Sequence, residues 1–336
     1  MKPGLVDVGR LATLVMVACL AAIPAETGAP SAEPSVLAPL AARSLLLHGT
    51  SAGDRLVVVG ERGHILLSRD GGTSWHQAAA PTRAMLTAVA FADVRTGCAV
   101  GHDEAIVCTW DGGEHWELVH FEPEEEQPLL TVLFLDRQRG FAAGAYGLFL
   151  ETSDGGRSWQ DRRISEDDLH FNHLALSAGG RVFLAAESGV ILRSDDAGAS
   201  WREISSPYHG SFFGTLPLEG DSVLAFGLRG NLFRSDDAGE TWLELESHTE
   251  GLLTHGTVLA DGTVVISAMG GSVLVSRDGG ESFDLHQLED RKGIAAVLEG
   301  VTGQLVRLGE GGVQPLLLLV DGVGKSPVAS AAGGGA

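Results

Sequence analysis

Basic residues, cysteine and tyrosine are scarce in this sequence, and each shortage narrows the range of functions. The chain has 23 lysines and arginines against 44 acidic residues, a net charge of −21. Because phosphate binding needs a basic surface, this charge argues against nucleic acid as a partner. It is compatible with a basic protein partner, and equally with a surface that only keeps the protein soluble.

The N-terminal apolar run is too short to cross a membrane, and long helical periodicity is absent. Residues 11–22 are apolar, which is 12 residues, whereas a spanning helix needs about 20. Lys2 and Arg10 precede the core of this run, and Ile23-Pro24-Ala25 offers a small-residue cleavage site. Residues 1–25 are therefore predicted to be an export signal rather than a membrane span.

Export would place the chain in the periplasm or outside the cell. Cys19 follows Met16-Val17-Ala18, a poor lipobox because Leu or Val is expected where Met16 stands, so we favour a soluble product over a lipoprotein anchored at Cys19. Residues 26–34 form a Pro/Ala linker, and residues 321–336 form a Gly/Ala-rich tail that is predicted to be disordered.

One short motif, in contrast, occurs six times. It reads Ser/Thr-x-Asp-x-Gly-x-x-Trp, with Phe283 in place of tryptophan in the last copy. Successive aspartates are 41, 43, 42, 41 and 41 residues apart. A fixed period of this length with one turn motif per unit indicates a radial β repeat.

Each residue of the motif has a role in folding. An apolar run precedes each copy and a strand-like run follows it, so the motif is predicted to be a hairpin turn. Asp accepts hydrogen bonds from nearby backbone N–H groups, Gly adopts positive φ, and the aromatic residue packs against the neighbouring repeat. The predicted structural residues are Asp70, Trp75, Asp111, Trp116, Asp154, Trp159, Asp196, Trp201, Asp237, Trp242, Asp278 and Phe283.

These residues form the Asp box, which recurs in sialidases and other BNR-repeat proteins. The longer repeat, clearest over residues 86–116 and 130–159, resembles that of Ycf48/HCF136-like proteins across roughly residues 35–320. That family consists of exported seven-bladed propellers known as photosystem II assembly factors, with relatives in bacteria that lack photosynthesis. The resemblance implies a WD40/YVTN-like propeller that binds protein and is not an enzyme.

The boxes account for six blades, and the C-terminal residues supply a seventh. Residues 294–298, 304–308 and 313–320 are strand-like runs without a box. If residues 35–37 add the missing outer strand, pairing of the N-terminal strand with the last blade closes the ring and removes its free edges. We therefore expect an all-β, seven-bladed propeller over residues 35–320, closed in this way and monomeric.

Cys98 and Cys108 lie on adjacent strands of one hairpin, and the sequence leaves two arrangements open. A three-residue turn would make them face each other, which allows a disulfide in an oxidising compartment. A two-residue turn would place them on opposite faces as small core residues. Neither has a CxxC partner, which argues against a metal site.

A binding site is expected on the face opposite the boxes. That face carries the turns between second and third strands and the crossings between blades, which differ from copy to copy. Arg62 and Arg229, each before a glycine in equivalent turns, are candidates for binding a partner, together with Tyr146 and Tyr208. Ycf48-like proteins carry an arginine patch, whereas here two of seven turn positions hold Arg and acids dominate the rest.

Histidines also recur near the expected blade crossings, with acids beside some of them. Their spacing matches no ligand motif, so we expect no metal and no other cofactor. They are His120, His170, His173, His209, His248, His255 and His286.

Three interpretations of function follow from these features. The favoured one is a non-enzymatic exported scaffold or assembly factor that binds a membrane or envelope protein. A second is a glycan-binding or sialidase-like protein. Sialidases use a tyrosine nucleophile, a carboxylate pair and three arginines, and their Arg-Ile-Pro motif is absent from this chain. A third is a structural ring with no defined site.

Overall fold

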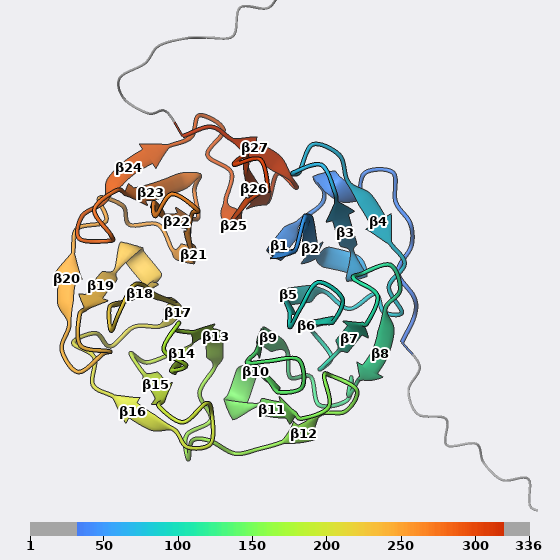
Figure 1. Cartoon of the computed structure of the whole chain (residues 1–336), viewed down its shortest axis with the longest axis horizontal. Helices are drawn as coiled ribbons and strands as arrows, with labels where there is room; N and C mark the ends of the chain where they lie inside the picture. The colour runs from blue at the N-terminus through green and yellow to red at the C-terminus, as the bar shows by residue number, and fades with distance from the viewer. Residues whose placement is uncertain (1–31, 319–336) are drawn as a thin grey trace, which may run out of the picture. The chain divides into compact units, whose positions relative to one another are not determined.

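In a computed structural model, residues 32–318 of the chain form seven antiparallel sheets arranged around a central axis (Figure 1). This confirms the predicted all-β, seven-bladed propeller. The predicted export signal (1–25), Cys19, most of the linker (26–34) and the tail (321–336) lie outside the described residues. None of the helices in the described part of the chain has the length and apolarity needed to cross a membrane.

The strands follow one another outward from the axis in every blade. Blade 1 contains β1 (Leu46–Ala52), β2 (Arg55–Gly60), β3 (Ile65–Ser68) and β4 (His76–Ala78). Blade 2 contains β5 (Leu86–Phe91), β6 (Gly97–Gly101), β7 (Ile106–Thr109) and β8 (Glu117–His120). Blade 3 contains β9 (Leu129–Phe134), β10 (Gly140–Gly144), β11 (Phe149–Thr152) and β12 (Gln160–Asp161). Blade 4 contains β13 (Phe171–Leu176), β14 (Val182–Ala186), β15 (Ile191–Ser194) and β16 (Arg202–Ile204).

The remaining blades repeat this order. Blade 5 contains β17 (Phe212–Pro217), β18 (Val223–Gly227), β19 (Leu232–Ser235) and β20 (Leu243–Leu245). Blade 6 contains β21 (Leu253–Val258), β22 (Val264–Ala268), β23 (Ser272–Ser276) and β24 (Asp284–Gln287). Blade 7 contains β25 (Ile294–Glu299), β26 (Leu305–Gly309) and β27 (Gln314–Leu316). Short 3₁₀ turns are η1 (Ala41–Arg43), η2 (Glu61–Gly63), η3 (Ala145–Gly147) and η4 (Leu228–Gly230).

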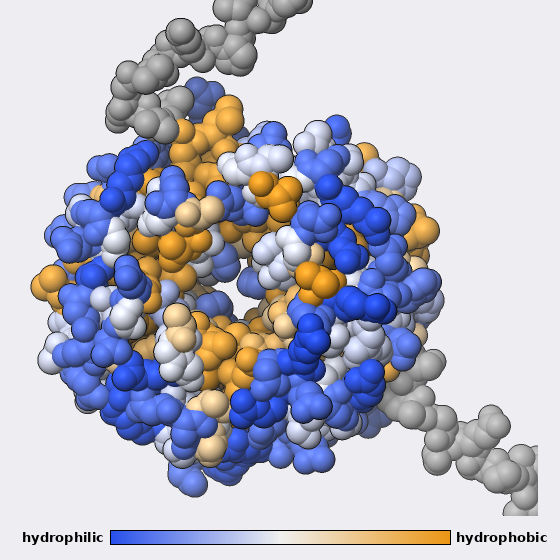
Figure 2. All heavy atoms as spheres, viewed as in Figure 1, coloured by the Kyte–Doolittle hydropathy of each residue, from blue (hydrophilic) through white to orange (hydrophobic). Residues whose placement is uncertain are grey.

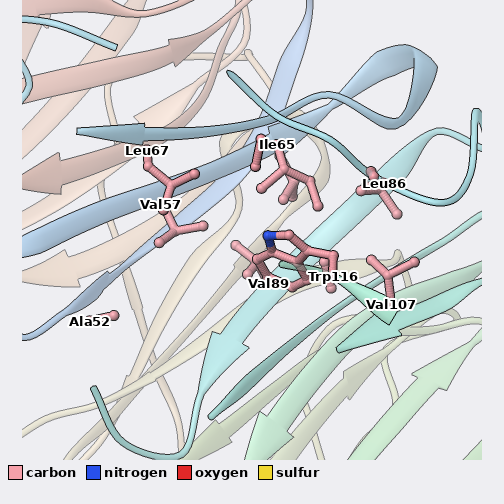
Figure 3. Packing of buried hydrophobic residues seen from close by; sticks show 12 residues of the cluster. Ala52, Val57, Ile65, Leu67, Leu86, Val89, Val107 and Trp116 are labelled. Carbon is pink, nitrogen blue, oxygen red and sulfur yellow. The ribbon is translucent and has the colours of Figure 1, made fainter. Parts of the chain in front are cut away.

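The hydrophobic core lies between neighbouring blades. Every residue of β6, β10, β14, β18 and β22 is buried, because each second strand is covered by a blade on either side. The buried side chains group into clusters that each join two adjacent blades. Figure 3 shows the cluster between blades 1 and 2, where Trp116 lies among Val57, Val89 and Val107.

The Asp boxes form the turns between third and fourth strands, and their polar groups are used within the turn. In blade 5, Oδ1 of Asp237 accepts hydrogen bonds from the Thr241 N–H at 2.8 Å and from the Ser235 hydroxyl at 2.8 Å. The Ser235 hydroxyl oxygen in turn accepts from the Gly239 N–H at 2.7 Å. The hydrogen bonds from the Thr241 hydroxyl and N–H, and then from Ser235, lower the pKa of Asp237 to about 2. The carboxylate of Asp237 therefore stabilises the turn when it is ionised.

The ring does not close by the predicted strand pairing. Residues 35–37 run beside the outer edge of blade 1, where the Ser35 N–H donates to the Ala80 carbonyl at 2.8 Å and the Gln77 side chain donates to the Val36 carbonyl at 3.0 Å. Blade 7 consequently has three strands within residues 32–318. Residues 35–37 pair beside β4 because unpaired groups are also available there. The local sequence does not indicate which free sheet edge these residues reach.

Packing across the junction of blades 7 and 1 closes the ring instead. Ala41 of η1 is buried in a cluster that contains residues of β1, β2, β3, β25 and β26. The Val313 N–H, just before β27, donates to the Ala42 carbonyl at 2.9 Å. A short 3₁₀ turn and apolar contacts therefore join blade 7 to blade 1.

Cys98 and Cys108 form a disulfide within blade 2. They are register partners in β6 and β7, with Cα atoms 4.1 Å apart. The Gly101 N–H donates to the Ala105 carbonyl, which leaves residues 102–104 as a three-residue turn. Of the two arrangements that the sequence left open, the structure has the one in which the cysteines face each other.

Candidate partner-binding face

The turn between second and third strands has the same backbone in most blades. Arg62, Tyr146 and Arg229 occupy its middle position with φ of 58°, 55° and 56°. Asp103 and Ser188 take the same position in blades 2 and 4, with φ of 59° and 60°. Non-glycine residues are uncommon at such φ values. Their recurrence at one turn position shows that the repeat imposes this conformation and uses it to display a variable side chain.

Hydrogen bonds hold these turns in place. The N–H of the first turn residue donates to a carbonyl at the start of the same blade, as from Glu61 to Leu45 at 3.0 Å, Ala145 to Pro128 at 3.0 Å and Leu228 to Ser211 at 3.2 Å. The glycine after the displayed residue lies against the following blade crossing, so that a Cβ on Gly230 would stand 1.8 Å from the Thr249 carbonyl oxygen. The side chains of the displayed residues are exposed on this fixed backbone in blades 1, 3, 4 and 5, whereas Asp103 of blade 2 is half-buried.

Tyr208 and Arg229 lie together at blade 5. The Tyr208 ring packs on Phe212 and Phe233, with centroids 5.2 and 5.7 Å away. Its hydroxyl donates to the carbonyl of Leu228, the neighbour of Arg229, at 3.3 Å. Burial raises the pKa of Tyr208, against the opposing effect of the Arg229 charge, so the phenol stays neutral. These contacts fix an aromatic surface next to an exposed guanidinium.

A polar hollow adjoins this pair. It has a volume of about 520 Å³ and is lined by Arg229, His248 and the carboxylates of Glu244, Glu246 and Glu250. One cation and three acids therefore face a single depression at the crossing from blade 5 to blade 6. Such a depression suits a polar segment that carries charges of both signs.

The other two predicted residues lie apart from this site. Tyr146 is 58% exposed at blade 3 and packs edge-on against His170, with centroids 4.9 Å apart. His170 is itself 3.5 Å from the Glu187 carboxylate. Arg62 is exposed at blade 1. The structure thus unites Tyr208 with Arg229 and places Tyr146 and Arg62 at separate points of the same face.

Two polar clusters were not found by sequence reasoning. Glu104 is buried in the turn of blade 2 and its carboxylate lies 3.1 Å from Nε2 of His120. His173 and His255, expected near blade crossings, lie instead on the innermost strands β13 and β21. A β-bulge in each first strand shifts the register just before these residues, and no local motif announces it.

His48 of β1 joins them in the central channel. The rings of His48 and His255 are 5.4 Å apart although blade 7 separates their blades, so they meet across the axis. Burial lowers the pKa of His48 and of His173 to about 4, and burial, followed by the charges of His48 and His173, lowers the pKa of His255 well below its usual value. Within residues 32–318 no three His, Cys, Asp or Glu side chains are arranged to hold a metal ion.

The sialidase-like interpretation requires a tyrosine beside a carboxylate and three arginines around it. The Tyr208 hydroxyl is bonded to a backbone carbonyl, and burial raises its pKa rather than activating it. Arg62 and Arg229 belong to blades 1 and 5 and do not converge on either tyrosine as a group.

Seven four- or three-stranded blades with Asp-box turns define a BNR-type β-propeller. The family model described as "Photosynthesis system II assembly factor YCF48" matches residues 119–315, more than half of the chain. The chain therefore belongs to the YCF48 family, as its repeat predicted.

Individual relatives agree with this assignment. The photosystem II assembly lipoprotein Ycf48 of Synechococcus sp. (strain CC9902) is 35% identical over 86 residues, which cover 25% of this chain and 26% of that protein. The chain thus matches about a quarter of that relative's length.

Solved structures share the fold. A structure of YCF48 bound to D1 peptide has a TM-score of 0.66 at 19% identity, covering 81% of this chain and 92% of that one. YCF48 from Cyanidioschyzon merolae has a TM-score of 0.65 at 16% identity, covering 84% and 97%. A streptogramin B lyase has a TM-score of 0.70 at 12% identity, covering 83% and 94%.

Proposed function

We propose that this protein is an exported, non-enzymatic scaffold that binds a polypeptide segment of a membrane or envelope complex during its assembly. The observation that carries the proposal is the Tyr208–Arg229 pair, fixed on a rigid turn beside a hollow lined by acids. Arginine and tyrosine side chains are common anchors in protein interfaces. The aromatic platform and the mixed charges fit a peptide that offers a carboxylate to Arg229 and a basic group to the glutamates.

Family membership supports an assembly role. The solved relative bound to a D1 peptide is a family protein with a polypeptide ligand. The Synechococcus relative is described as a photosystem II assembly lipoprotein. For this chain we propose a broader class of partner, a membrane or envelope protein. Arginine occupies two of the seven turn positions on this face, which is less than the arginine patch expected from the family resemblance.

Export is supported by two features. The signal predicted at residues 1–25 would direct the chain out of the cytoplasm. The Cys98–Cys108 disulfide suits an oxidising compartment such as the periplasm. We propose a periplasmic or extracellular location for the mature protein.

Affinity capture from a solubilised envelope fraction tests the proposal. Wild type should retain a defined set of membrane proteins. Arg229→Glu should lower the captured amount of these proteins roughly tenfold or more, because it removes an interface anchor. The control is Arg69→Glu, because Arg69 is an exposed arginine in the Asp box of blade 1, on the opposite face. Arg62→Glu shows whether blade 1 contributes to the same interface.

Two results would contradict the proposal. Identical partner sets for wild type and Arg229→Glu would favour a ring with no defined site on this face. Hydrolysis of a fluorogenic sialoside that Tyr208→Phe abolishes would show that the chain is an enzyme.

A further inference from the structure

In blades 1 to 6 the aromatic residue of the Asp box packs into the junction with the preceding blade, which for blade 1 is blade 7. Trp116 packs between blades 1 and 2, as Figure 3 shows. The same holds around the ring for Trp159 (blades 2 and 3), Trp201 (3 and 4), Trp242 (4 and 5), Phe283 (5 and 6) and Trp75 (7 and 1). A large flat side chain is thus a regular part of the junction.

The junction between blades 6 and 7 has no such side chain. Its described core consists of aliphatic residues, including Val273, Val275 and Leu316. The sequence has no Phe, Trp or Tyr after Phe283. In the pairing register Leu316 takes the place of the box serine Ser276, so Leu318 stands where the other blades have the box aspartate.

A cavity of about 660 Å³ lies at this junction. Val275 lines it and stands just before the box serine of blade 6, as Leu67 does in blade 1. Leu67 is a neighbour of Trp116 in the filled junction. Leu259, Leu305 and Leu316 complete the apolar wall of the cavity. The side of the cavity formed by Val275 and Leu305 therefore corresponds to the place that an aromatic ring takes at the other junctions, and the cavity extends past β27 to the Asp box of blade 1.

The rim of the cavity is mainly acidic. Asp261 and Glu299 border it, and Arg277 on the same rim lies 4.0 Å from the Asp284 carboxylate of its own blade. The outer lip is apolar, since Leu317 is 82% exposed. Figure 2 shows apolar surface at the outer edge of the ring near blade 7, within a mainly polar surface. An aromatic group flanked by cations matches this combination.

We propose that this cavity, here called the junction pocket, binds an aromatic side chain of a partner polypeptide that carries basic residues beside it. The partner's ring takes the place of the missing box aromatic between blades 6 and 7. The chain's own residues after Phe283 supply no aromatic group for this purpose. Because Gly71, Gly72 and Thr73 of an Asp box line the pocket, it lies on the box face and is a second docking point, separate from the Arg229 hollow.

Titration of the full mature chain with a short peptide, acetyl-Lys-Gly-Trp-Gly-Lys-amide, tests the proposal by calorimetry or NMR. The tryptophan peptide should bind about tenfold more tightly or better than its alanine counterpart, because burial of the indole supplies most of the interaction. Arg229→Glu should leave this affinity unchanged, which separates this result from the fate of the proposed function.

Two variants locate the binding. Leu305→Trp places an indole of the chain's own in the pocket and should abolish binding, whereas Leu243→Trp, at an exposed position of blade 5, should leave it unchanged. Asp261→Lys reverses one rim charge without touching the apolar wall. It should weaken binding about threefold to tenfold, and it serves if Leu305→Trp fails to fold.

Four outcomes would overturn the proposal. The first is equal affinity for the tryptophan and alanine peptides. The second is an affinity for the tryptophan peptide that neither Leu305→Trp nor Asp261→Lys changes. A third is a roughly tenfold gain in affinity when the chain is ended at Leu318, which would identify its own C-terminal residues as the occupant. The last is a dimer in light scattering that Leu305→Trp dissociates, which would identify a second copy.

Discussion

Acid should destabilise this propeller through the channel histidines well before its carboxylates are protonated. In the folded state the pKa of His48 and of His173 is about 4, against an ordinary value of 6.5. The unfolded chain therefore binds protons first as the pH falls below 6.5, and stability is lost between pH 6.5 and pH 4. For each imidazole the free energy of unfolding should fall by at most about 2 kcal/mol between pH 7 and pH 5, because both side chains are half-buried beside the channel and are partly solvated.

Another blade of the chain shows which residue can replace a channel histidine and keep its hydrogen bond. Nδ1 of His48 accepts a hydrogen bond from the Val89 N–H at 3.3 Å. At the equivalent site of blade 3, Oγ1 of Thr131 accepts from the Leu174 N–H at 3.0 Å. Threonine thus performs the same task at this repeat position without a titrating group. The double variant His48→Thr/His173→Thr should fold and should lose the part of the pH dependence that these two imidazoles contribute, while His255 keeps its own.

Denaturant unfolding followed by tryptophan fluorescence at pH 7 and pH 5 measures the effect. His76→Thr is the control, because His76 is exposed on β4 and should not change the pH dependence. Box aspartates such as Asp237, with a pKa of about 2, stay ionised across this range and cannot cause the loss. If wild type and the double variant lose the same free energy between pH 7 and pH 5, the reasoning is wrong.

Two further predictions concern stability. Ser235→Ala should lower the free energy of unfolding by about 1–3 kcal/mol, because the Gly239 N–H loses its acceptor in a buried turn; Thr73→Ala, at an exposed box position, should change it by less than about 0.5 kcal/mol in the same thermal melts. Replacing both Cys98 and Cys108 by serine should cost about 3 kcal/mol for a loop of this length. The denatured wild-type mature protein should show no free thiol until a reductant is added, and thiols that react without reductant would contradict the disulfide.

The sequence predicted the ring because each blade carries its own local instructions. The box aspartates fix one turn per unit, and their spacing fixes the number of units. The closure was mispredicted because residues 35–37 can pair with more than one free edge, and which edge they reach depends on the path through Ala41 to the junction of blades 7 and 1. That path is a property of the assembled ring.

The candidate site was only partly predictable for a similar reason. Arg62, Tyr146, Tyr208 and Arg229 were assigned to one face from the order of strands alone. Which of them meet depends on contacts between a turn and the following crossing, such as the Tyr208 hydroxyl on the Leu228 carbonyl. The meeting of His48 and His255 across the channel depends on ring curvature and on bulges, which leave no local signature.

The uniform turn between second and third strands has a consequence for how such proteins diverge. Its backbone is held by main-chain hydrogen bonds and, in blades 1, 3, 4 and 5, by a glycine that follows the tip residue. Arginine, tyrosine, serine and aspartate already alternate there within one molecule. Point mutations at these tips can therefore change the chemistry of one face of the ring while its melting temperature stays nearly constant.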